Sequence, residues 1–101
     1  KLEIVREMFV LDPTESVFRE LLLIKLKADK TVRSAIIEIV DIYRARIIDL
    51  SKDSMIIELT GAPDKIDGFM KMLDCYEMVE FCSTGVTGIH RGVREYTRFE
   101  D

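Results

Sequence analysis

Residues 19–61 constrain the fold more than any other part of the chain. Their apolar pattern predicts a strand over 19–28, a helix over 31–43, and two further strands over 45–51 and 54–60. Only Lys52 and Asp53 separate the last two strands. Because so short a connection joins antiparallel neighbours, these two strands are expected to form a hairpin.

The residues that follow complete a recognisable order of elements. Pro63 suits the first turn of a second helix, and residues 78–83 have the composition of a fourth strand. The resulting β-α-β-β-α-β order predicts an α+β, ferredoxin-like (ACT-like) fold. In that fold a four-stranded antiparallel sheet carries both helices on one face. The opposite face of the sheet is left open.

The first predicted strand has two different faces. Leu22, Ile24, Leu26 and Ala28 alternate with Leu21, Leu23, Lys25 and Lys27. The first set is wholly apolar and is expected to lie under the helices. The second set is apolar at one end and charged at the other, and an apolar area on an uncovered sheet face usually marks a contact with a partner. We therefore predict that Leu21 and Leu23 belong to a self-association face and that the chain forms a homodimer.

Composition excludes several classes of function. The chain has 101 residues, of which 48% are hydrophobic, so one domain with a substantial core is expected. The net charge of −4 disfavours nucleic-acid or anionic-membrane binding, which needs clustered Lys and Arg. No apolar run approaches the ~20 residues of a membrane span. Two cysteines without disulfide-dense spacing favour a reducing, cytoplasmic location.

The residues that most often carry chemistry form no convincing constellation. His90 is the only histidine, and it is expected in a surface loop. Cys75 and Cys82 fit no metal or redox spacing and are expected to behave as small buried apolar residues. The acidic residues near the predicted hairpin are interpreted as a solvated surface: Asp49, Asp53 and Glu58. The sequence therefore predicts no catalytic, cofactor-binding or metal-binding residue, and no cofactor.

Two binding motifs are incomplete in this sequence. Gly85, Gly88 and Gly92 lack the lysine and the following helix of a phosphate-binding loop, although Arg91 leaves a weak anion contact open. An RNA-recognition module of the same element order needs aromatic residues on its open sheet face. The first and third predicted strands offer none there, which argues against RNA binding.

Several short segments, taken in order, carry a family resemblance. They read RELLLIK (19–25), EIVDIYRA (38–45), IIDLS (47–51) and SMIIELTG (54–61), followed by Lys65-Ile66, Thr84-Gly85 and Arg91-Gly92. This series resembles the C-terminal domain of the small, regulatory subunit of acetolactate synthase (acetohydroxyacid synthase). The chain departs from the family pattern at Ser83, at Tyr76-Glu77 and at Gly88-Ile89-His90.

The resemblance also implies domain boundaries. Residues 1–18 are similar to the last strand of a preceding ACT domain plus a linker, residues 19–92 to the C-terminal domain, and residues 93–101 to a polar tail. In the family the valine site belongs to the preceding ACT domain. The resemblance therefore assigns no valine-binding residue to this chain.

The function implied by the resemblance is regulatory. The small subunit is not catalytic; it binds and activates the large subunit, which uses thiamine diphosphate, magnesium and FAD in branched-chain amino-acid biosynthesis. Two other hypotheses stay open. A free-standing ACT-like sensor would bind an amino acid where the first strand meets the first helix, although Ala28-Asp29-Lys30-Thr31 lacks a Gly-rich turn. An enzyme in its own right would have to work with a lone histidine and unpaired carboxylates.

Overall fold

A computed structural model of the chain describes residues 12–93. Its elements are β1 (Ser16–Lys27), α1 (Lys30–Tyr43), β2 (Arg46–Leu50), β3 (Ser54–Gly61), α2 (Pro63–Met72), β4 (Met78–Ser83) and β5 (Thr87–His90). The first six elements follow the predicted order, and the ferredoxin-like α+β fold is confirmed. Residues 1–11 of the expected strand remnant and linker, and most of the expected tail, lie outside the described residues.

The chain divides into two compact units. One is Phe18–Thr87 and contains both helices. The described part of the other consists of residues 12–17 and 88–93. In this second unit the backbone N–H of Arg91 donates to the carbonyl of Glu15 at 2.8 Å. The N–H of Asp12 donates to Nε2 of His90 at 3.2 Å.

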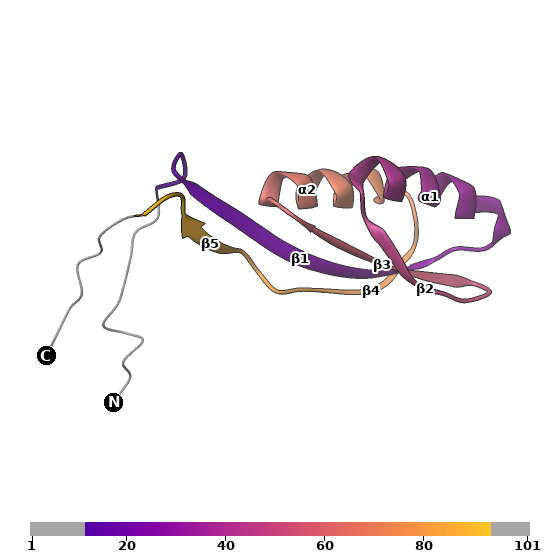
Figure 1. The fold of residues 1–101 in the computed structure, drawn as a ribbon. Coiled ribbons are helices and arrows are strands. Elements are labelled where there is room, and N and C mark those ends of the chain that lie inside the picture. The colour runs from indigo at the N-terminus through magenta and orange to yellow at the C-terminus, as the bar shows by residue number, and fades with distance from the viewer. Residues whose placement is uncertain (1–11, 94–101) are drawn as a thin grey trace, which may run out of the picture. The chain divides into compact units, whose positions relative to one another are not determined.

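The sheet has the strand order β2-β3-β1-β4, with β5 pairing β1 off this path. All three pairings along the path are antiparallel. Both helices lie on the same side of these strands (Figure 1). Strand β1 is therefore an inner strand, while β2 and β4 form the two outer edges of the path.

The core lies between the helices and one face of the sheet. Alternate residues of β1 and β3 point into it, and the helices contribute an apolar stripe each. The fully buried large side chains are Leu22, Ile24, Leu26, Ile36, Met55, Ile57, Leu59, Phe69 and Leu73. The rings of Phe69 and Tyr43 meet edge to face with centroids 5.3 Å apart.

Helix α1 begins and ends with recognisable caps. The Asp29 carboxylate accepts hydrogen bonds from the backbone N–H of Thr31 at 2.9 Å and from the Thr31 hydroxyl at 2.5 Å. This satisfies one of the unpaired amides of the first turn. Arg44 follows the helix in the left-handed conformation, with φ of 57°. Its N–H reaches back to the carbonyl of Asp41.

Three features differ from the sequence-based expectations. Residues 87–90 form strand β5, where only a Gly-containing segment was expected. The prediction of a surface loop for His90 is wrong, because this residue lies in β5 and is only 9% exposed. The prediction of buried cysteines is also wrong, since Cys75 and Cys82 are both exposed.

Candidate functional site: an interaction surface

The open face of the sheet is formed by the residues that alternate with the core residues. In register across the strands, Arg46 lies opposite Glu58, which lies opposite Leu23, which lies opposite Cys82. The next row on the same face runs Asp49, Ile56, Lys25 and Glu80. The face therefore mixes a small apolar centre with charges of both signs.

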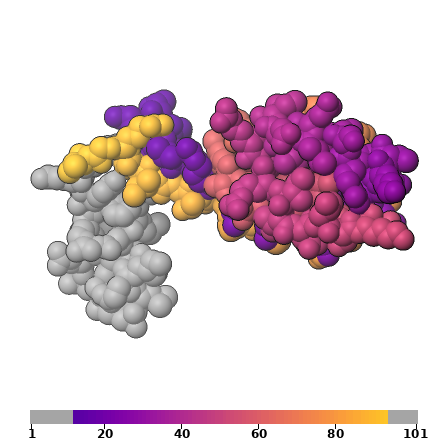
Figure 2. Space-filling model, turned by 45° about the vertical axis from the view of Figure 1, so that its right-hand side comes forward, coloured from indigo at the N-terminus to yellow at the C-terminus, as the bar shows by residue number. Residues whose placement is uncertain are grey.

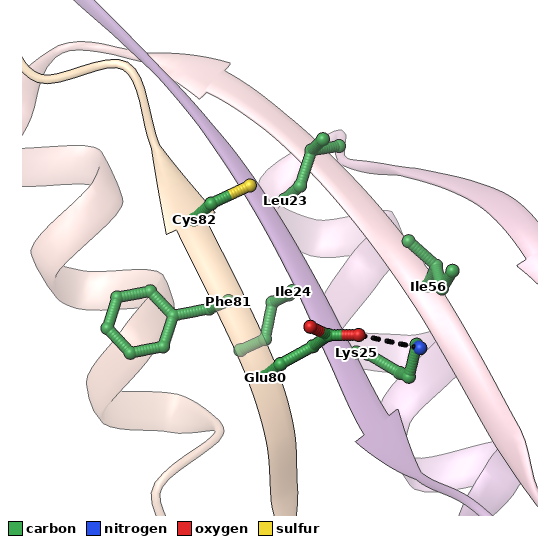
Figure 3. A pocket seen from close by; sticks show the side chains of 7 residues that line it. All are labelled: Leu23, Ile24, Lys25, Ile56, Glu80, Phe81 and Cys82. Atoms are coloured by element: carbon green, nitrogen blue, oxygen red, sulfur yellow. Dashed lines mark hydrogen bonds and ion pairs between the residues drawn. The ribbon is translucent and has the colours of Figure 1, made fainter.

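A hollow of about 260 Å³ lies on this face over β1 and β4. Leu23, Ile56 and Cys82 supply its apolar part (Figure 3). Phe81 also borders the hollow, but in Figure 3 its ring points away from Leu23 and Cys82. The hollow is partly open to solvent, whereas small molecules usually bind in enclosed pockets, so it suits a protein side chain better than a small molecule.

An ion pair crosses the floor of the hollow. Lys25 Nζ donates a hydrogen bond to Glu80 Oε1 at 2.8 Å. This hydrogen bond, with the attraction between the two charges, raises the pKa of Lys25 and lowers the pKa of Glu80. Both groups therefore stay charged over the neutral range, and the polar side of the hollow carries one positive and one negative charge.

Leu21 and Leu23, the predicted self-association residues, lie on the open face as expected. Both are half-buried. Their paired neighbours on β3, Thr60 and Glu58, are polar. The apolar part of the open face is therefore narrow, and it is centred on Leu23, Ile56 and Cys82.

Other large apolar side chains are exposed along the two outer strands. On β2 the exposed fractions are 36% for Ile47, 48% for Ile48 and 55% for Leu50. On β4, Val79 and Phe81 are 50% and 57% exposed. The sequence marked these residues as apolar strand positions, but it did not show that both strands lie at an edge.

A second hollow, of about 520 Å³, lies where β1 meets α1. This is the place at which a sensor of the ACT-like class would bind its ligand. Its lining includes three acidic residues: Asp29, Asp53 and Glu77. The nearby backbone amide of Thr31, at the start of α1, already donates to Asp29. The geometry therefore does not favour an amino acid at this position.

The described residues also bear on metal binding and on membrane insertion. Between residues 12 and 93, no group of three or more His, Cys, Asp or Glu side chains converges to hold a metal ion. None of the helices in this part of the chain is both long and apolar enough to cross a bilayer.

The fold and this surface define an ACT-like α+β module that exposes apolar and charged strand surfaces. A family model described as the small subunit of acetolactate synthase matches residues 19–92. The chain belongs to this family, in its C-terminal domain.

Individual relatives agree with the family match. The chain is 44% identical over 79 residues to the acetolactate synthase small subunit of Mycolicibacterium smegmatis, covering 78% of this chain and 46% of that protein. It is 41% identical over 91 residues to a probable small subunit of Archaeoglobus fulgidus, covering 89% and 57%. The crystal structure of the Thermotoga maritima small subunit matches with a TM-score of 0.75 and 35% identity, covering 81% of this chain and 50% of that one. The chain thus spans about half the length of these relatives.

Proposed function

We propose that this chain is the C-terminal part of a regulatory small subunit that binds the catalytic subunit of acetolactate synthase and raises its activity. The observation that carries the proposal is the family match over residues 19–92. The exposed strand surfaces support it, because association between subunits requires apolar area that becomes buried. The chain itself would not be catalytic.

The proposal extends to partners, location and boundaries. The partner would be a thiamine-diphosphate-dependent large subunit of branched-chain amino-acid biosynthesis, in the cytoplasm. Residues 19–92 would form the regulatory domain, with residues 1–18 as the remnant of a preceding ACT domain and linker, and 93–101 as a tail. The chain would also form a homodimer, with Leu21 and Leu23 of the open face taking part.

The first experiment compares the mass and the activity of the cognate large subunit with and without this chain. Light scattering should show a complex larger than either component, and acetolactate formation per large subunit should rise. An unrelated ferredoxin-like domain of similar size serves as the control for crowding and adsorption. A large subunit whose mass and activity both stay unchanged would overturn the proposal.

Calorimetry with branched-chain amino acids separates the sensor hypothesis from this proposal. Saturable heat from the isolated chain would favour a sensor. The occupied Thr31 amide and the acidic lining of the hollow beside it lead us to expect none.

A further inference from the structure

Strand β2 is an exposed edge strand that could pair with a strand of another chain. It lies at one end of the strand order, so no other strand of the β2-β3-β1-β4 path covers its outer edge. All five of its residues are exposed, and three of them are Ile47, Ile48 and Leu50. The segment from α1 to β3 forms much of the surface of the Phe18–Thr87 unit in Figure 2 (magenta to pink). An exposed edge rich in apolar residues is a template for another strand.

The charges of β2 complement one another. A register shift lies between Ile47 and Asp49, so that Arg46 opposes Glu58 and Asp49 opposes Ile56. Because Glu58 and Ile56 are two residues apart on β3, Arg46 and Asp49 share the open face. In a regular strand, residues three apart would lie on opposite faces. The bulge thus places one positive and one negative side chain on the same face of this edge.

The opposite edge of the sheet, strand β4, does not carry charges of both signs. Strand β4 reads MVEFCS and carries Glu80 without any Lys or Arg in the strand to face it. Two β4 strands brought together would place like charges near one another, which is unfavourable.

We propose that β2 pairs antiparallel with β2 of a second copy of this chain, with Arg46 of each copy opposite Asp49 of the other. In this register Ile47 lies opposite Ile48 of the second copy, and a two-fold axis generates two Arg46–Asp49 pairs. The interface is isologous and closes as a dimer. It rests on the self-association part of the proposed function and adds a second contact surface to the one proposed at Leu21 and Leu23. It does not depend on binding of the catalytic subunit.

The register can be tested by reversing one charge at a time in the full chain. Arg46→Glu gives a copy that is acidic at both positions, and Asp49→Lys gives a copy that is basic at both. Each variant alone should form the dimer at least about tenfold more weakly than the unchanged chain, because like charges then face each other across the axis. An equimolar mixture should form a heterodimer in which both pairs again join opposite charges. In one pair the introduced glutamate faces the introduced lysine, and in the other the retained Arg46 faces the retained Asp49.

Native mass spectrometry with one variant carrying a mass tag counts homodimers and heterodimers separately. Lys71→Glu, which changes an exposed charge in the last turn of α2, is the matched control and should mix without preference. Far-ultraviolet circular dichroism of each variant checks that the fold is retained, since Arg46 also lies 3.9 Å from Glu58.

Preferential heterodimer formation supports the proposal. A monomeric unchanged chain, self-association that neither variant weakens, or variants that fail alone and also fail together would each overturn it. The result is independent of the large-subunit assay. A heterodimer that does not bind the large subunit would contradict the proposed function alone, whereas a bound chain without charge-dependent pairing would contradict this inference alone.

Discussion

Leu23 is the residue at which a single substitution should most weaken self-association through the open face. It is half-buried, and with Ile56 and Cys82 it lines the apolar part of the hollow. We expect Leu23→Asp to weaken self-association at least about tenfold, because a carboxylate in a desolvated contact has no partner to offset the loss of water. Sedimentation velocity over a concentration series measures the change.

The matched control for that variant is Ser54→Asp. Ser54 lies on the same face but opposite Lys27, away from the hollow. This variant adds the same charge and should leave the sedimentation profile as it is. If Leu23→Asp folds and sediments like the unchanged chain, Leu21 and Leu23 do not belong to the contact.

Asp29 gives the chain a local dependence on pH. Its hydrogen bonds from the hydroxyl and the backbone of Thr31 hold the pKa of its carboxyl below the ordinary value of 3.8. Since the folded-state pKa is the lower one, the charged form favours folding. Its contribution is fully present above about pH 4 and is lost as the pH falls through the folded-state pKa.

Two substitutions separate the cap from its charge. Asp29→Ala should lower the Tm at pH 7 by about 5 °C, since a capping side chain is removed from α1. Asp29→Asn should keep the cap, so its Tm at pH 7 should stay near that of the unchanged chain. Between about pH 5 and about pH 2 its Tm should fall less than that of the unchanged chain, because asparagine has no carboxylate to protonate. Thermal unfolding followed by circular dichroism at each pH measures both. Equal acid sensitivity of Asp29→Asn and the unchanged chain would contradict the assigned role.

His90 shows where residue-level sequence reasoning stops. A lone histidine between Ile89 and Arg91 gave no reason to expect burial. The structure buries it because β5 pairs with the start of β1, about 70 residues earlier in the chain. Its Nε2 accepts from the backbone of Asp12, a contact that depends on two distant segments. No local pattern in the sequence encodes such a pairing.

At the scale of elements, Arg33 connects helix α1 with the β2–β3 turn. Its Nη2 donates to the carbonyls of Ala28, Ser51 and Lys52 at 3.2, 3.0 and 2.8 Å. We expect Arg33→Ala to lower the free energy of unfolding by about 1–2 kcal/mol, because three carbonyls lose a charged donor and the bond to Ala28 is part-buried. Urea unfolding measures this loss. Arg33→Lys is the control that keeps the charge without the planar fork, and it should recover only part of the stability.

The helices and strands were largely predictable from the sequence, but the way in which the strands pair in space was not. Strand β4 has the bounds expected from its composition, and α1 begins only one residue before the expected position. The edge positions of β2 and β4 follow from non-local pairing, which a single sequence does not display. For the same reason the sequence could not show that Cys82 lies exposed on the open face, or that a bulge brings Arg46 and Asp49 together.

At the scale of the whole molecule, the open face and the β2 edge point in different directions. Pairing along β2 joins the sheets of two copies edge to edge. The open faces of both copies then lie on the same side of the joined sheet and stay uncovered. A contact through Leu21 and Leu23 would then join two such pairs. Two isologous surfaces on one chain produce assemblies larger than a dimer. The regulatory role proposed here thus includes a way to present several copies of the chain to catalytic subunits.

The buried core predicts which part of the chain folds alone. Every buried apolar side chain found among residues 12–93 lies between Leu22 and Leu73. A fragment of residues 16–87 keeps that core, both helices and the strands of the β2-β3-β1-β4 path. It also keeps the hydrogen bond from the Thr84 amide to the carbonyl of Leu21. Among the residues that the structure describes, the contacts it loses are those of residues 12–15 and 88–93, such as that of His90 with Asp12.

We therefore expect the 16–87 fragment to unfold cooperatively, with a Tm within about 5 °C of the full chain. A fragment ending at residue 76 is the matched control. It lacks β4, which pairs with β1 from Leu22 to Leu26. Without β4, the backbone of β1 has unpaired groups along one side, and the core beneath it is exposed at that edge. The shorter fragment should therefore show no cooperative transition by circular dichroism. If the 16–87 fragment behaves in the same way, the stability of the domain depends on residues beyond its own core.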